Sequence, residues 1–229
     1  MSMIDAPLRR RLVLVFAATL LFCAGSYLWL DRPVALWFKA NLHGTWSVLF
    51  HRITELGLGG VWLVPAALGA ILFRWAEVRA KSDRAQALWH VHANAALFLF
   101  LSVAASGLTV DLLKGVIGRL RPYELFVHGA YGFAPLSIDW GRNSFPSGHG
   151  QTIVAAMTSL AAIWPRGRPL WYAVAVLVAA SRVIISVHYL SDVAMGAYFG
   201  VVGTILLARL FRARGWQIDV SGTWRLRRD

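Results

Sequence analysis

Residues 12–30, "LVLVFAATLLFCAGSYLWL", form an unbroken stretch of 19 residues without a charge. A helix rises about 1.5 Å per residue, so a stretch of this length crosses most of the roughly 30 Å hydrocarbon core of a bilayer. The stretch is too long for the apolar part of a signal peptide, and no clear A-x-A cleavage site follows it. We therefore expect a retained membrane helix here.

The rest of the composition agrees with a membrane protein. Of the 229 residues, 58% are hydrophobic and 15% are charged, whereas soluble domains carry about a quarter charged residues. Five further apolar runs follow, at about 56–73, 87–113, 149–164, 170–187 and 191–211. The sequence predicts an all-α integral membrane bundle of six transmembrane helices. We expect a single domain over residues 1–229, with its core at about 12–211 and a basic cytoplasmic tail at 212–229.

The positive charge is distributed as membrane topology requires. The net charge is +12, but the basic residues cluster between the apolar runs, which argues against a nucleic-acid partner. With six spans, 15 of the 23 basic residues fall on one side, which the positive-inside rule assigns to the cytoplasm together with both termini. They are Arg9, Arg10, Arg11, Arg74, Arg79, Lys81, Arg84, Arg166, Arg168, Arg209, Arg212, Arg214, Arg225, Arg227 and Arg228.

Three stretches collect polar residues on the opposite, outer side. They are "KGVIGRLRP" at 114–122, "PSGH" at 146–149 and "SRVIISVHYLSD" at 181–192. Lys114, Arg121 and Arg182 supply cations, and arginine is suited to phosphate oxygens. Ser147 and Gly148 precede a helix start, where unpaired backbone N–H groups attract anions. These features together predict a phosphate-binding site.

Two histidines add chemistry to this site. His188 and Asp192 are four residues apart, so we expect them on one face of a helix, with the carboxylate fixing the imidazole tautomer. The other ring nitrogen of His188 can then attack phosphorus, while His149 protonates the leaving oxygen.

The position of Arg182 relative to His188 is left open by the sequence. The two residues are six apart and do not share a helix face. Either the helix breaks near Val187, or the long arginine side chain reaches around.

The three stretches together resemble the type 2 phosphatidic acid phosphatase superfamily. Its signature is K-x6-R-P, then P-S-G-H, then S-R-x5-H-x3-D, and every position is matched here. The resemblance implies metal-independent hydrolysis of a lipid phosphomonoester or pyrophosphate, without a cofactor, through a phosphohistidine. It implies His188 as the nucleophile, His149 as the acid and Asp192 as the orienting partner. It also implies a bacterial cytoplasmic membrane, with the active site on the periplasmic face.

The identity of the lipid stays open at this point. Polyprenyl pyrophosphate, phosphatidylglycerol phosphate, phosphatidic acid and lipid A 1-phosphate all offer the same terminal phosphate. Transfer of the phosphate to an acceptor lipid is an alternative, and a transporter with buried charges is another. The charges at one boundary and the lack of repeated halves argue against the transporter. The oligomeric state is not indicated.

Several polar residues have plainer interpretations. Ser144 or Ser147 can be a helix N-cap, and Asp111 with Lys114 can be an i, i+3 ion pair. Arg119 can contact phosphate or a lipid headgroup. The long loop at 123–145 is expected to lie on the outer leaflet and to shape lipid access.

Overall fold

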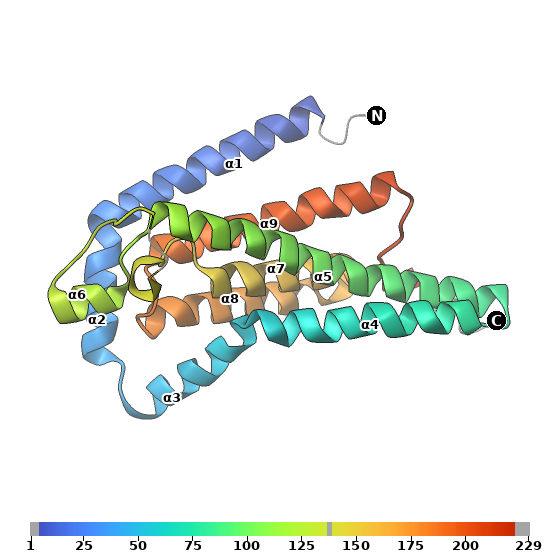
Figure 1. Cartoon of the computed structure of the whole chain (residues 1–229), viewed down its shortest axis with the longest axis horizontal. Coiled ribbons are helices and arrows are strands. Elements are labelled where there is room, and N and C mark those ends of the chain that lie inside the picture. Colours follow the sequence, from blue (N-terminus) through green and yellow to red (C-terminus); the bar gives the residue numbers. More distant parts are fainter. Residues whose placement is uncertain (1–4, 137–138, 223–229) are drawn as a thin grey trace.

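The computed structural model describes residues 5–136 and 139–222, and the regular elements in these ranges are helices. The long helices run along a common axis (Figure 1). The main elements are α1 (Ala6–Gly25), α2 (Asp31–Asn41), α3 (Gly44–Ile53), α4 (Gly59–Arg79), α5 (Asp83–Ile117), α6 (Pro122–His128), α7 (Gly148–Ile163), α8 (Arg168–Ile184) and α9 (Leu190–Ala213). A 3-10 turn, Thr54–Gly57, joins α3 to α4.

The all-α class is confirmed for the described part of the chain, whereas the count of six spans is not. Five segments are long and apolar enough to cross a membrane: Ala6–Asn41, Gly44–Arg79, Asp83–Ile117, Pro165–Ile184 and Leu190–Ala213. The run predicted at 149–164 corresponds to α7, which at 16 residues is shorter than each of these five segments. Helix α7 nevertheless lies along the bundle axis, beside α8 (Figure 1).

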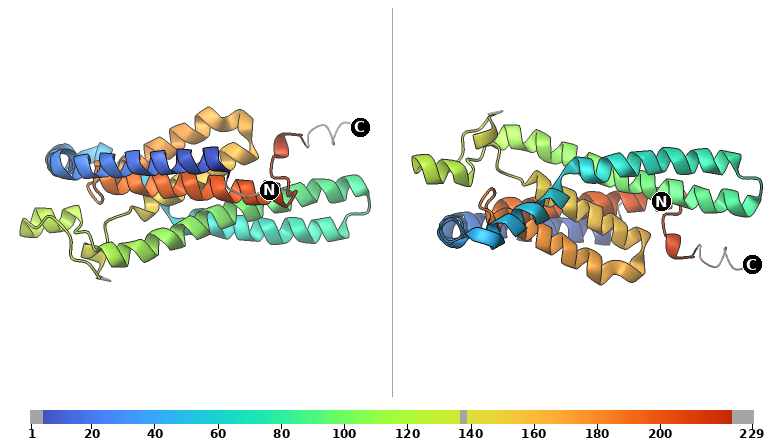
Figure 2. Two further views of the ribbon diagram at one scale, coloured as in Figure 1. Left: turned by 90° about the horizontal axis from the view of Figure 1, so that it is seen from above. Right: turned by 90° about the horizontal axis from the view of Figure 1, so that it is seen from below.

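The first apolar run does not end where the sequence pattern suggests. Helix α1 continues through a π-helical turn, Ser26–Leu30, directly into α2. Helices α2 and α3 then lie across one end of the bundle, and α6 lies at the same end (Figures 1 and 2). Trp37 in α2 and Trp46 in α3 are 60% and 66% exposed. Exposed tryptophans are typical of residues at the membrane–water interface.

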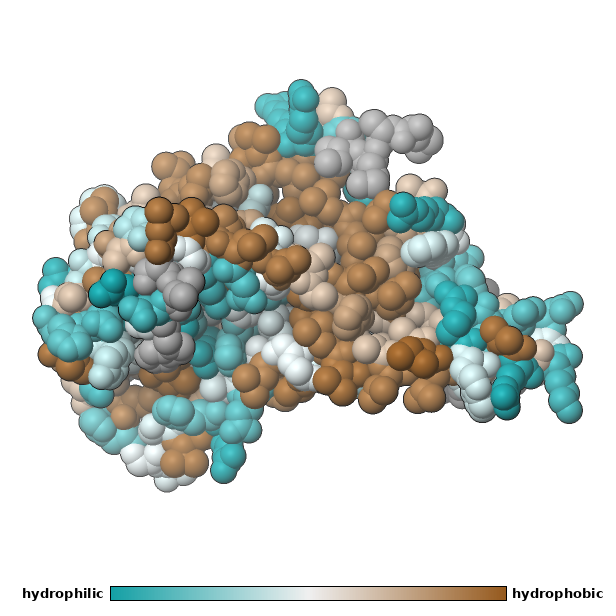
Figure 3. Space-filling model, in the orientation of Figure 1, coloured by the Kyte–Doolittle hydropathy of each residue, from teal (hydrophilic) through white to brown (hydrophobic). Residues whose placement is uncertain are grey.

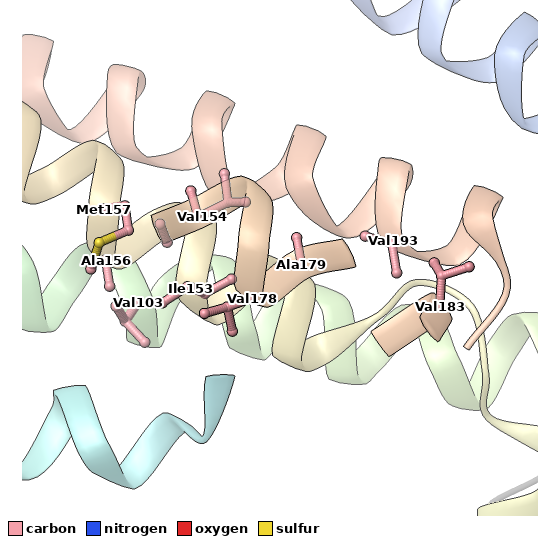
Figure 4. Close-up of a cluster of buried hydrophobic side chains, with 11 residues drawn as sticks. Val103, Ile153, Val154, Ala156, Met157, Val178, Ala179, Val183 and Val193 are labelled. Carbon is pink, nitrogen blue, oxygen red and sulfur yellow. The ribbon is translucent and has the colours of Figure 1, made fainter. Parts of the chain in front are cut away.

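Helix α7 lies at the centre of the bundle and fixes the position of the "PSGH" stretch at 146–149. Its apolar side chains pack against α5, α8 and α9 in one buried cluster that includes Ile153, Met157 and Val178 (Figure 4). Gly196 of α9 lies so close to the start of α7 that a Cβ at this position would be 2.3 Å from the backbone carbonyl oxygen of Ser147. Small residues permit such close helix contacts in membranes. The N-terminus of α7 is therefore held against α9.

The surface has the polarity expected of a bilayer protein. Hydrophobic residues cover the middle of the visible face, and hydrophilic residues gather at both ends (Figure 3). The end with α2, α3 and α6 holds the predicted site, and the other end holds the hairpin between α4 and α5 (Figure 1). Part of the predicted basic tail, residues 223–229, lies outside the described residues.

Candidate active site

The three polar stretches of the sequence meet at one end of the bundle. They lie at the end of α5, the start of α7 and the turn between α8 and α9. The backbone N–H of Ser147 donates to the carbonyl of Asp192 at 2.9 Å. A Cβ on Gly148 would be 2.9 Å from Lys114 Nζ, so the absence of a side chain at Gly148 lets this amine approach the backbone.

The turn before His188 decides between the two alternatives for Arg182. Helix α8 ends at Ile184 and α9 begins at Leu190, so the helix breaks. The carbonyl of Arg182 accepts from the N–H groups of both Val187 and His188, each at 3.2 Å. These bonds fold the chain back, so that residues six apart in sequence lie close together.

The predicted pairing of His188 with Asp192 is confirmed, but the reason given for it was wrong. His188 precedes α9 and shares no helix face with Asp192. Asp192 lies in the first turn of α9, and its Oδ2 accepts from the Tyr189 N–H at 2.8 Å. This local bond turns the carboxylate back toward His188, whose Nδ1 lies 3.4 Å from Oδ2. The contact is therefore made across the helix N-terminus.

The two serines before α7 have different partners. Ser147 is the N-cap of α7, since its hydroxyl accepts from the Gly150 N–H at 3.2 Å. Its role in phosphate binding stays a prediction. Ser144 is not a cap. Its hydroxyl donates to Asp192 Oδ2 and lies 3.4 Å from His188 Nδ1, so it joins the histidine and the carboxylate in one buried group.

Arg119 has partners that the sequence did not reveal. The side chain is buried, and it donates through Nη1 to Asp192 Oδ1 and through Nη2 to Asp31 Oδ2, the latter at 2.7 Å. Contact with phosphate or a lipid headgroup, as considered from the sequence, does not fit this position. Asp31 was missed altogether. A carboxylate at the end of an apolar run is a signal that could have found it, because such charges are usually paired.

The three predicted phosphate-binding cations reach the site from different elements. Arg182 donates through Nη1 to the Thr54 hydroxyl at 2.8 Å, and Arg121 through Nη2 to Asn143 Oδ1 at 3.2 Å. The Lys114 amine lies 3.4 Å from Asp111 Oδ1, which confirms the i, i+3 pair. Burial lowers the pKa of Arg121 to about 10. The uncharged Thr54 hydroxyl orients Arg182 without neutralising it.

Burial also sets the protonation of His188. Removal from water lowers its pKa to about 3, and the nearby charges of Arg121 and Arg182 act in the same direction. The hydrogen bond to Asp192 opposes this shift but does not reverse it. At neutral pH the ring is uncharged, which is the form that can act as a nucleophile.

A cavity of about 280 Å³ adjoins the site and is lined in part by its residues. Its polar end is formed by Lys114, Gly148 and His149, and its apolar wall by residues of α4 and α5 that include Leu63 and Leu108. In the described ranges, no group of three or more His, Cys, Asp or Glu side chains is placed to hold a metal ion. Metal independence stays a prediction.

Comparison with known proteins gives a family and two named relatives. The model of the PAP2 superfamily matches residues 95–216. Lipid A 1-phosphatase of Rhizobium johnstonii is 39% identical over 133 residues, which are 58% of this chain and 54% of that protein. Lipid A 1-phosphatase of Rhizobium etli is 37% identical over 145 residues, 59% of this chain and 62% of that protein. The matched part therefore spans little more than half of each relative.

The crystal structure of a transmembrane PAP2 type phosphatidylglycerolphosphate phosphatase from Bacillus subtilis has the same fold. It superposes with a TM-score of 0.64, covers 88% of this chain and 96% of that one, and is 22% identical.

Proposed function

Because this chain belongs to the PAP2 superfamily, we propose that it is an integral membrane phosphatase that removes a terminal phosphate from a lipid. The observation that carries the proposal is the buried pair of His188 and Asp192 beside three cations from two of the polar stretches. The two named relatives make lipid A 1-phosphate the first candidate substrate. Phosphatidylglycerol phosphate, phosphatidic acid and polyprenyl pyrophosphate follow as alternatives.

The phosphate is held by charge and by backbone donors. Lys114, Arg121 and Arg182 neutralise its oxygens, and the N–H groups at the start of α7, near Gly148, add donors at the positive end of the helix dipole. Such donors act most strongly on charge that develops in the transition state, and the loss of one typically costs about 3–4 kcal/mol. The partners of Arg182 and Arg121, described above, support a preorganised site.

The reaction proceeds in two displacements. Nδ1 of His188 is turned toward Asp192, so we assign the attack to Nε2. A bond forms from Nε2 to phosphorus, the bond from phosphorus to the lipid oxygen breaks, and His149 gives its proton to that oxygen. Water then gives a proton to His149 and attacks phosphorus. The phosphorus–nitrogen bond breaks, and inorganic phosphate leaves.

The cavity supports a lipid rather than a soluble phosphate ester. It is polar at Lys114 and His149 and apolar along α4 and α5. Leu108 on its wall is 64% exposed, as expected of a side chain that contacts lipid. A substrate with a phosphate on one end and acyl chains on the other matches both parts of the cavity.

We place the site on the periplasmic face of a bacterial cytoplasmic membrane, with both termini in the cytoplasm. Six passes are supported by α7, which runs along the axis between the two ends despite its length (Figure 1). Basic residues such as Arg74, Arg84 and Arg168 lie at the end away from the site, where the positive-inside rule expects the cytoplasm.

The test is phosphate release by the purified protein in detergent, with the four lipids and with EDTA present. Release from one lipid that persists in EDTA and disappears in His188→Ala supports both the substrate and the mechanism. Phosphate found on a second lipid instead of in solution would replace hydrolysis by phosphotransfer. Release that EDTA abolishes would contradict the metal-independent reaction.

A further inference from the structure

A chain of paired ionisable side chains lies behind the nucleophile and belongs to no part of the phosphate-binding machinery. It runs from His188 to Asp192, from Asp192 to Arg119 and from Arg119 to Asp31. The Asp31 and Asp192 side chains are fully buried, and that of Arg119 is 2% exposed. Such burial is rare for charged residues unless they are paired.

The guanidinium geometry explains how one cation serves two carboxylates. Arg119 uses a different terminal nitrogen for each, and Nη1 also donates to the Ser191 hydroxyl at 2.6 Å. That hydroxyl in turn donates to Asp31. The planar fork of an arginine presents donors on separate nitrogens at fixed angles, whereas a lysine carries its three donors on a single nitrogen.

Asp31 is fixed by further bonds from two other elements. The Ser26 hydroxyl donates to its Oδ1 at 2.7 Å, and the Ser191 N–H donates to the same oxygen at 3.1 Å. Asp31 begins α2, the helix that lies across the end of the bundle, and Ser191 lies in the first turn of α9 next to the catalytic carboxylate. Asp31 therefore connects α2 to the first turn of α9.

Aromatic rings enclose the guanidinium and keep water from it. Tyr189 lies 4.5 Å and Tyr27 lies 5.3 Å from its central carbon, and Tyr131 and Phe133 add to the enclosure. Tyr131 and Phe133 come from the loop that the sequence linked to lipid access. In such surroundings two carboxylates cannot both stay ionised without a cation, because desolvation and like charge each favour protonation.

We propose that Arg119 and Asp31 are positioning residues that keep Asp192 ionised and correctly oriented behind His188. Neither touches the phosphate; both act through Asp192. This inference rests on the proposed function, since it assigns the two residues to the nucleophile of that reaction. It adds a contribution from α2, which lies outside the three motifs and outside the part matched by the family model.

The first test compares Asp31→Asn with the matched change Glu77→Gln, which alters a carboxylate in an ion pair at the other end of the bundle. We expect Asp31→Asn to lower kcat roughly 10- to 100-fold, as changes behind a reacting group commonly do, with KM within about twofold of wild type. Glu77→Gln should leave both constants unchanged. Wild-type kcat in Asp31→Asn, or an equal loss in Glu77→Gln, would overturn the proposal.

Arg119 is tested by substitution with lysine and with methionine. Lysine keeps the charge but lacks the rigid fork that holds both carboxylates, so Arg119→Lys should retain several times more activity than Arg119→Met, and both should lie below wild type. Equal activity of the two variants would contradict a role for the charge.

A double variant tests whether Asp31 acts through Asp192. Asp31→Asn combined with Asp192→Asn should be no slower than Asp192→Asn alone, because the effects of residues that act through one another are not additive. Independent, multiplied losses would count against the proposal.

A binding measurement separates this inference from the proposed function. Orthovanadate can bond to a nucleophile at the phosphorus position and mimic the transition state, whereas inorganic phosphate binds to the cations alone. We expect Asp31→Asn to weaken the binding of vanadate roughly tenfold and the binding of phosphate less than about twofold, as measured by calorimetry. This measurement does not require turnover. If the wild-type protein is inactive on all four lipids, only the substrate proposal is refuted, and the positioning role is still tested by anion binding. If the binding of both anions were weakened equally, the positioning role would be overturned.

Folding is controlled by size-exclusion chromatography in detergent. If Asp31→Asn does not yield a monodisperse protein, Ser191→Ala replaces it, because that change removes a hydroxyl that bridges Asp31 and Arg119. A smaller loss of roughly three- to tenfold in kcat is then expected for one hydrogen bond. Unchanged kcat in this variant would overturn the proposal.

Discussion

Two ends of this bundle carry the same three kinds of side chain in opposite surroundings. At the site end, Arg119, Asp192 and His188 are 0–2% exposed. At the other end, Arg74 and His90 bind the two oxygens of Glu77 at 2.7 and 2.9 Å, but they are 49% and 43% exposed. Bond lengths alone would rank the two groups as similar.

Burial makes the difference between these clusters. Exposed ion pairs typically contribute about 0–1 kcal/mol, since water competes for both partners. Breaking a buried pair typically costs about 3–5 kcal/mol, because a charge is left without compensation. The site end is therefore fixed in one arrangement, as chemistry requires, whereas the other end can exchange partners with water.

The largest expected effect comes from replacing the two histidines. His188→Ala should abolish turnover, by roughly 10³-fold or more, because the nucleophile itself is lost. His90→Ala should retain wild-type activity. Both variants are assayed as purified proteins with the preferred lipid. Residual turnover of His188→Ala near the wild-type rate would rule out the nucleophile assignment.

The two carboxylates give the next contrast. Asp192→Asn should leave a trace of activity, roughly 10²- to 10⁴-fold below wild type, since the histidine loses its orienting partner. It should also lower stability by about 3–5 kcal/mol, against about 0–1 kcal/mol for Glu77→Gln. Denaturation in detergent, followed by circular dichroism, measures the second pair of values. Similar stability losses in both variants would show that burial does not separate the clusters.

The arginines provide a smaller effect. Arg182→Ala should reduce kcat/KM roughly 10²- to 10³-fold through the loss of a phosphate donor. Thr54→Val, which removes the hydroxyl that orients Arg182, should cost about 1 kcal/mol of transition-state binding, or roughly fivefold. Arg168→Ala at the other end serves as control and should have no effect. A Thr54→Val variant as slow as Arg182→Ala would imply a further role for Thr54.

The pH dependence of stability gives the smallest and most specific contrast. His188 in the folded protein has a pKa of about 3, below the ordinary value of about 6.5. The unfolded chain therefore takes up a proton that the folded one refuses, and stability falls as pH drops from about 6.5 toward 3. The melting temperature of wild type should fall more steeply from pH 7 to pH 4 than that of His188→Gln. Parallel curves would contradict the depressed pKa.

Much of this organisation can be read from the sequence. Long uncharged runs predict membrane helices because a bilayer imposes a minimum length, and that constraint is local. The motif residues Lys114, His149, Arg182 and His188 could be grouped because each lies at the same boundary of an apolar run. The structure brings these stretches together as expected. The predicted number of membrane spans is least certain at α7. This helix is buried in the bundle, so it need not be as long as a lipid-facing helix.

The reasons for local contacts were harder to predict. The spacing of His188 and Asp192 predicted their pairing on one helix face. In the structure His188 precedes α9 and Asp192 lies in its first turn, so the contact is made at the N-terminus of the helix. Spacing in sequence fixes a distance once the helix boundary is known. The boundary itself depends on the turn at 185–189, whose hydrogen bonds to Arg182 have no clear sequence signal.

The sequence by itself determined that this chain is a membrane protein with its cations, histidines and carboxylate at one boundary. Only the tertiary structure decided which charges meet. Arg119 lies two residues from Arg121, yet it pairs with Asp31, which is 88 residues away, and is enclosed by aromatic rings. An arginine has the same donors wherever it lies. Which acceptors it binds, and whether water competes for them, follows from packing around the side chain, and packing is a property of the folded bundle.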